Sequence, residues 1–209
     1  CNVTDAGEIA ADQENCGPFV PETLTSVEDA SGGVGPIIYV WISHLEGEDW
    51  ATIPGADGTE YSPGLVSETT YFRRCARNEG CEDFVGESND IVITIHESLE
   101  LDMTSEGVDC DDEESGAATA TVTSGTAPYT YLWSDGQTTA TAINLAAGTY
   151  IVTATDANGC SDTASVVVNQ VSNSYVYNVS NVSCNGGSDG CIDVTGGTAP
   201  LTYVLNGTP

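Results

Sequence analysis

Short runs in which apolar and polar residues alternate recur along the chain, each bounded by Gly, Pro, Asn or Asp. Alternation with a period of two is typical of strands with one buried face, and such strands at spacings of about 8 to 12 residues indicate a β-sandwich. No stretch has the longer period of an amphipathic helix. The pattern therefore predicts an all-β chain.

One predicted strand occurs three times, at Gly32–Trp41, Ser124–Trp133 and Gly196–Leu205. In each copy a proline is followed three residues later by a tyrosine and two residues after that by Trp41, Trp133 or Leu205. Such recurrence indicates repeated modules. Because the aromatic residues recur at the same strand position, we expect them to pack in a core rather than bind sugars. Small residues would lie opposite them to fill a thin sandwich, namely Ala118, Ala120 and Ala154.

Matching landmarks divide the chain into three modules. Tyr71 precedes Cys81 by ten residues, as Tyr150 precedes Cys160. We expect β-sandwich modules at residues 1–97 and 98–170, and the start of a further, incomplete one at 171–209. Half a sandwich exposes apolar surface and open strand edges. We therefore expect the polypeptide to continue past Pro209, with strand exchange between subunits as the alternative.

The charge of the chain excludes several partners. It has 32 acidic residues and three basic ones, which gives a net charge of −29 over 209 residues. Nucleic acids and anionic membrane surfaces need a basic patch, so neither is expected as a partner. No long apolar span or signal peptide is present, so we expect no membrane insertion in this segment and a mature or partial chain. Arg73, Arg74 and Arg77 are expected to pair with carboxylates of a neighbouring module.

The eight cysteines show no zinc-binding spacing, which favours disulfides and a compartment outside the cytoplasm. In the middle module Cys110 and Cys160 are the two candidates for a pair. By analogy Cys16 would bond Cys81 in the first module, with Cys16–Cys75 as the alternative, and Cys1 is also expected to form a disulfide. In the last module we expect Cys184–Cys191.

Candidate chemistry is sparse. No catalytic motif is present, so we expect no enzyme activity. Carboxylates are hard oxygen ligands, and their clustering before the middle module predicts a Ca²⁺ site at the joint between modules. The candidate ligands are Asp109, Asp111, Asp112, Glu113 and Glu114, joined by Asp156 and Asn158 if Cys110 and Cys160 are bonded. Trp50, on an insertion of the first module, is a candidate ligand contact.

The middle module resembles the SprB-type repeat of Bacteroidetes surface proteins. The resemblance is carried by an opening cysteine with acidic neighbours, by "SGTAPYTYLWSDGQTT", by "LAAGTYIVTATDANGC" and by a closing valine strand. It extends in part to "VSCNGGSDGCIDVTGGTAP", where Cys191 and Leu205 depart from the pattern. The first module, with "GEIAADQENC" and "TTYFRRCAR", looks like an immunoglobulin-like module that accompanies such repeats.

The resemblance implies tandem immunoglobulin-like or PKD-like β-sandwich modules in an elongated protein. It further implies a repetitive adhesin or filament on the bacterial cell surface, exported by the type IX system and in some members used in gliding. Asp162-Thr163-Ala164 matches the O-glycosylation pattern of that phylum, which makes Thr163 a candidate site.

The residues and the resemblance together lead us to expect one of two functions. The first is a non-catalytic stalk or fibre segment of an extracellular adhesin or filament, whose partners are neighbouring modules or subunits. The alternative is a ligand-binding module for surface glycans, alone or attached to a secreted enzyme.

Overall fold

The computed structural model describes residues 3–84, 86–108, 114–170, 176–180 and 191–195, the last two ranges as backbone only. These residues form strands and no helix, as the alternation predicts. They belong to two compact units, which are described separately. The first unit comprises Cys1–Glu100 with two later segments, Val122–Tyr129 and Thr155–Asp162. The second comprises Leu101–Thr121, Thr130–Ala154 and Thr163–Pro209.

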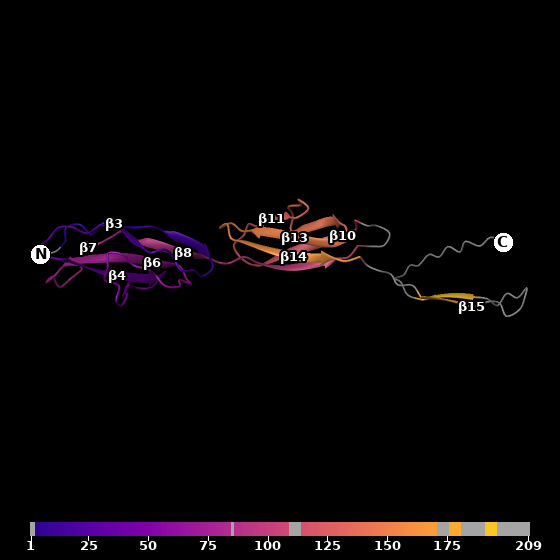
Figure 1. Cartoon of the computed structure of the whole chain (residues 1–209), viewed down its shortest axis with the longest axis horizontal. Coiled ribbons are helices and arrows are strands. Elements are labelled where there is room, and N and C mark those ends of the chain that lie inside the picture. The colour runs from indigo at the N-terminus through magenta and orange to yellow at the C-terminus, as the bar shows by residue number, and fades with distance from the viewer. Residues whose placement is uncertain (1–2, 85, 109–113, 171–175, 181–190, 196–209) are drawn as a thin grey trace, which may run out of the picture. The chain divides into compact units, whose positions relative to one another are not determined.

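The first unit is built on one large sheet with the strand order β2-β8-β6-β4-β5, and β7 also pairs with β6 (Figure 1). Strands β1 and β3 form a separate pair. The central strands β4 and β6 are antiparallel, whereas β2 runs parallel to β8. The strands of this unit are β1 Glu8–Ala10, β2 Gln13–Cys16, β3 Thr25–Glu28, β4 Ile37–Leu45, β5 Ala51–Thr52, β6 Thr70–Asn78, β7 Gly86–Glu87 and β8 Ile91–His96.

Alternation along β4, β6 and β8 directs every second side chain into the core of the first unit. Trp41 is fully buried and Phe72 is nearly so. The core cluster consists of Ile9, Leu24, Trp41, Ala56, Val66, Phe72, Ile91 and Ile93. Burial of each large apolar side chain stabilises the fold by about 1.5 to 3 kcal/mol.

The second unit is a sandwich of two three-stranded sheets, ordered β12-β10-β9 and β11-β13-β14. Side chains from both sheets meet in one core. A separate antiparallel pair is formed by β15 Val176–Ser180 and β16 Cys191–Thr195. The sandwich strands are β9 Glu100–Glu106, β10 Gly116–Ser124, β11 Thr130–Trp133, β12 Thr141–Leu145, β13 Gly148–Thr155 and β14 Ser161–Val168.

The recurring tryptophan has the same structural role in both units. Trp41 and Trp133 are buried, and each indole N–H donates to a carbonyl further along the chain, that of Gly58 at 3.0 Å and that of Thr139 at 2.8 Å. Ala118 and Ala120 are buried in the same core cluster as Trp133. The prediction that these tryptophans pack in cores is confirmed, while the third copy of the motif lies outside the described residues.

Candidate functional site

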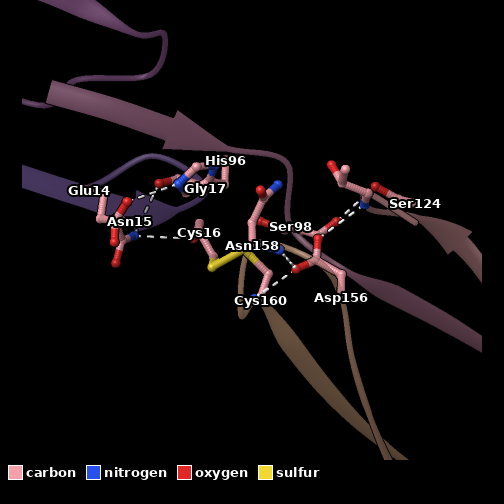
Figure 2. Close-up of a disulfide and its surroundings, with 11 residues drawn as sticks. Glu14, Asn15, Cys16, Gly17, His96, Ser98, Ser124, Asp156, Asn158 and Cys160 are labelled. Atoms are coloured by element: carbon pink, nitrogen blue, oxygen red, sulfur yellow. Dashed lines mark hydrogen bonds and ion pairs between the residues drawn. A yellow bond between two sulfur atoms is a disulfide. The ribbon is translucent and has the colours of Figure 1, made fainter. Parts of the chain in front are cut away.

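The first unit contains a disulfide that the sequence did not predict. Cys16, the last residue of β2, is bonded to Cys160, which precedes β14 (Figure 2). Their Cα atoms lie 5.6 Å apart, and the bond spans 144 positions of sequence. Cys160 is buried, whereas Cys16 is exposed. The bond covalently ties the end of β2 to the turn between β13 and β14.

Both predicted partners of Cys16 are wrong, because strand pairing places Cys16 at the other end of the sheet. Cys16 is level with His96 on β8, three residues beyond Ile93. Ile93 is level with Thr70 on β6, and Cys75 lies five residues further along β6 in the opposite direction. At 3.3 Å per residue the separation of Cys16 from Cys75 is about 26 Å, whereas a disulfide needs Cα atoms within about 7 Å. Cys81 lies further along the chain beyond Cys75.

The predicted Cys110–Cys160 bond is also wrong, since Cys160 is bonded to Cys16. Val108 forms a bridge with Gln170, ten residues beyond Cys160 along and past β14. This corresponds to about 33 Å of extended strand. Val108 is therefore at the other end of β14 from Cys160.

The structure describes the state of two of the remaining cysteines, Cys81 and Cys75. Cys81 is disulfide-bonded, although not to Cys16. Cys75, predicted as a disulfide partner, is instead a free thiol buried on β6. Its burial raises its pKa, as does the nearby carboxylate of Glu87, while Arg73 acts in the opposite direction. Cys1, Cys110 and Cys184 lie outside the described residues, as does the predicted pair of Cys184 with Cys191.

Asp156 organises the turn that carries Cys160. Its Oδ1 accepts hydrogen bonds from the backbone N–H groups of Asn158 at 2.8 Å and Cys160 at 2.9 Å (Figure 2). Its Oδ2 accepts one from the backbone N–H of Thr126 at 3.0 Å. Gly159 closes the turn with a positive φ of 83°. The three N–H donors, that of Thr126 first, favour the carboxylate and lower the pKa of Asp156. The Asp-x-Asn-Gly sequence thus forms the turn between β13 and β14.

The segment that carries Thr123 and Ser124 also contacts this part of the first unit. Ser124 Oγ lies 2.8 Å from the carbonyl oxygen of Ser98 and 2.9 Å from a carboxylate oxygen of Glu97. The preceding residue Thr123 donates its hydroxyl to the carbonyl of Glu100 at 3.3 Å. Together with Cys16, Cys160 and Asp156 these contacts form what is called here the disulfide cluster.

The disulfide cluster does not have the arrangement expected for calcium. The predicted contribution of Asp156 and Asn158 depended on a Cys110–Cys160 bond, and the carboxylate of Asp156 is engaged by backbone donors instead. Within the described residues no group of three or more His, Cys, Asp or Glu side chains could hold a metal ion. Asp109, Asp111, Asp112 and Glu113 lie outside those residues, so a Ca²⁺ site there stays a prediction.

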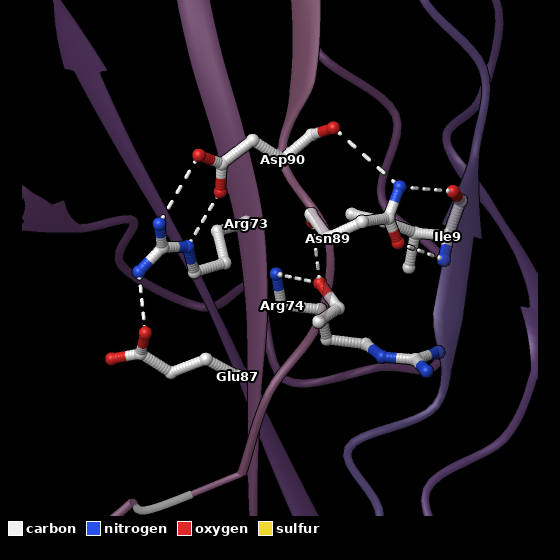
Figure 3. A network of polar contacts seen from close by, with 7 residues as sticks. Ile9, Arg73, Arg74, Glu87, Asn89 and Asp90 are labelled. Atoms are coloured by element: carbon white, nitrogen blue, oxygen red, sulfur yellow. Dashed lines mark hydrogen bonds and ion pairs between the residues drawn. The ribbon is translucent and has the colours of Figure 1, made fainter.

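The three arginines of β6 make their contacts within the first unit, which contradicts the expected pairing with a neighbouring module. Arg73 forms ion pairs with Asp90 at 2.6 Å and with Glu87 at 2.5 Å (Figure 3). The hydrogen bond to Asp90 raises the pKa of Arg73. Arg77 donates to the carbonyl of Cys81 and lies over the ring of Phe84.

Arg74 is fully buried, and its guanidinium is held mainly by neutral oxygens. It donates to Ser26 Oγ at 2.8 Å and to the carbonyls of Thr59 and Glu28 at 3.0 Å. It also lies over the Tyr39 ring, 4.7 Å from the centroid. Burial lowers the pKa of Arg74. This contact set makes Arg74 a structural tie between β6, strand β3 and the loop that carries Thr59.

Trp50 belongs to a half-buried cluster on the outward side of β4 and β6, called here the aromatic cluster. His44 is adjacent to Trp50 at 4.3 Å and stacks on Tyr71 at 4.7 Å between ring centroids. Arg73 lies over the Trp50 ring at 4.5 Å, with its other contacts fixed by Glu87 and Asp90. The sequence singled out Trp50 but not its neighbours. In the sequence, the alternation of these neighbours along two adjacent strands was the signal that could have placed them on one face.

Thr163 lies at an exposed position of β14. Its hydroxyl is 3.0 Å from that of Thr153 on the neighbouring strand β13. Glycosylation at Thr163 stays a prediction. No helix of the described residues has the length and apolar character needed to cross a membrane.

These features define the class: an all-β protein of packed sheets, with a disulfide closing a long stretch of chain. Residues 5–97 match a family described as a domain of unknown function (DUF8696), and residues 104–138 and 176–208 match the SprB repeat. The second match confirms the resemblance seen in the sequence and indicates a structural module of a surface protein.

No curated protein matches the chain. Among solved structures, "Structure of amphioxus IgVJ-C2 molecule" is 15% identical, with 75% of this chain and 99% of that chain covered and a TM-score of 0.37.

Proposed function

We propose that this chain is a non-catalytic structural segment of an extracellular bacterial adhesin or surface filament, in which repeated disulfide-bonded β-sandwich modules form a stalk or fibre. The SprB matches support a surface protein. The disulfide supports an oxidising location outside the cytoplasm. Export by the type IX system and a part in gliding belong to this proposal through the resemblance.

The Cys16–Cys160 bond is the observation that carries the proposal. Tension applied to the chain before Cys16 and after Cys160 passes through the disulfide, so it bypasses the intervening residues. Those residues include every strand from β3 to β13. Without the bond, 144 positions could extend by roughly 500 Å. A stalk under load therefore cannot pull out the strands from β3 to β13, because the force passes across the bonded ends of that stretch.

Single-molecule stretching between the termini tests this function. We expect the oxidised chain to lack an extension of roughly 500 Å that the Cys16→Ser, Cys160→Ser variant shows. The double variant is preferable to a reductant because it leaves the disulfide of Cys81 intact. If the oxidised wild-type chain already extends by that length, the bond does not protect the sheets and the load-bearing role is wrong.

The aromatic cluster favours one alternative, a glycan-binding module. Aromatic rings stack on sugars, and Trp50, His44 and Tyr71 lie in a row on one side of the sheet beside a fixed guanidinium. On a glycan array, this alternative predicts saturable binding by the whole chain that Trp50→Ala abolishes. Phe84→Ala, which removes a ring stacked on a different arginine, should leave such binding unchanged. Absence of binding by the wild-type chain would exclude the alternative.

A further inference from the structure

Strand β4 pairs with a neighbour along its whole length on one side and along less than half of it on the other. Every residue of β4 from Ile37 to Leu45 is matched with a residue of β6. On the other side β5 is matched only with Ile42 and Ser43. Beyond these, Trp41 receives a hydrogen bond from Ile53 and donates one to Ala56. The segment from Ile37 to Val40 is therefore an edge of the sheet.

The hydrogen-bonding groups of this edge can be assigned from their neighbours. The backbone N–H and C=O groups of Trp41 point away from β6, because their partners are Ala56 and Ile53. In an antiparallel strand these directions alternate, so Ile37 and Tyr39 also point away from β6, whereas Ile38 and Val40 point toward it. No described residue pairs with the backbone of Ile37 or Tyr39 on the open side. Two N–H and two C=O groups are thus available in strand register.

These four groups match those of a second copy of the same edge. With two copies antiparallel and Ile38 opposite Ile38, Ile37 of each copy lies opposite Tyr39 of the other. Each such pair exchanges two backbone hydrogen bonds, and Ile38 occupies the intervening non-hydrogen-bonded position. The short edge is consequently self-complementary about a two-fold axis, which is the usual symmetry of protein dimers.

The absence of charged residues makes this edge a place where two copies can approach each other. Two chains of net charge −29 repel each other over most of their surfaces. The segment from Ser31 to Ser43 contains no charged residue, and Val34 within it is 84% exposed. The edge strand β2 on the far side of the sheet differs, because it carries Glu14 and ends in the disulfide. Edge strands that avoid pairing are commonly protected by charge, and β4 lacks that protection between Ile37 and Val40.

We propose that two copies of this chain associate through antiparallel pairing of Ile37–Val40, which joins their β4–β6 sheets side by side. The contact is small, so each pairing is weak, and repetition along a larger assembly would strengthen it by avidity. It would link neighbouring chains laterally. It does not involve the Cys16–Cys160 bond, so either conclusion can fail without the other.

Cysteine cross-linking of the whole chain tests the register. In the proposed pairing the Cβ atoms of the two Ile38 residues lie about 4.5 to 5.5 Å apart, close to the separation in a disulfide. We expect Ile38→Cys to form a covalent dimer under mild oxidation about tenfold faster than Val92→Cys, because pairing holds its thiols together. Val92 is the matched control, since it is also half-buried but lies on β8, away from this edge. Wild-type protein controls for the buried thiol of Cys75.

A proline substitution tests the backbone contribution. Ile37→Pro removes an N–H that points to the open side and bonds no described residue, at the first position of the strand, where proline is tolerated. In the Ile38→Cys background it should reduce cross-linking to the Val92→Cys rate, with the circular dichroism spectrum unchanged. Equal rates for Ile38→Cys and Val92→Cys over the whole range of protein concentration would overturn the proposal. A proline variant that folds and cross-links at the full Ile38→Cys rate would do the same.

Discussion

At the scale of single residues, the buried polar groups of the first unit are held mostly by the backbone. Arg74 donates to one carbonyl at the end of β3 and to one in the loop that carries Thr59. Asp156 accepts from three N–H groups. Such contacts matter because a buried polar group without a partner destabilises the fold by about 1 to 3 kcal/mol. Asp156 is the clearer case to test, since its charge can be removed with little change of shape.

Asp156→Asn should destabilise the chain at neutral pH and have less effect in acid. The pKa of Asp156 is lowered on folding, so its stabilising contribution is present above the unfolded pKa near 3.9 and is lost as the pH falls through the folded value. Urea unfolding of both proteins between pH 7 and pH 3 measures this. The difference in unfolding free energy should shrink below about pH 4. A difference that stays constant over that range would show that the carboxylate charge is not what stabilises the turn.

At the scale of strands, the alternation of apolar and polar residues predicted which side chains face a core. It did not predict which strands pair with each other. It placed Trp41, Trp133, Ala118 and Ala120 in cores correctly, because a period of two is set by the local backbone. It could not show that β2 runs parallel to β8, since that neighbour is 80 residues away along the chain. The parallel pairing is what carries Cys16 away from Cys75 and toward Cys160.

The failed disulfide assignments have the same origin. Each expected bond joins two cysteines of one module, Cys110 with Cys160 in the middle module and, by analogy, Cys16 with a cysteine of the first module. The bond that forms depends on which strand ends come together, and sequence spacing does not contain that information. Trp50 was found because it lies on an insertion, whereas His44, Tyr71 and Arg73 beside it required the register of β4 against β6.

At the scale of the whole molecule, the net charge of −29 opposes compactness and makes cations natural stabilisers. The acidic run Asp109–Glu113 is the strongest candidate for a Ca²⁺ site. A ligand that binds only the folded state stabilises it by about 2.7 kcal/mol at a hundred times its Kd. We therefore expect added Ca²⁺ to raise the melting temperature by several degrees, and excess chelator to reverse the change.

Two controls separate a specific site from general screening. NaCl at matched ionic strength should give a smaller shift, and Asp111→Asn with Asp112→Asn should remove most of the Ca²⁺ effect. Asp156→Asn should keep the Ca²⁺ response, because the carboxylate of Asp156 already accepts three backbone hydrogen bonds in the disulfide cluster. An unchanged midpoint after chelation would rule out the site. A Ca²⁺ response lost only in Asp156→Asn would instead locate the ion at the turn beside Cys160.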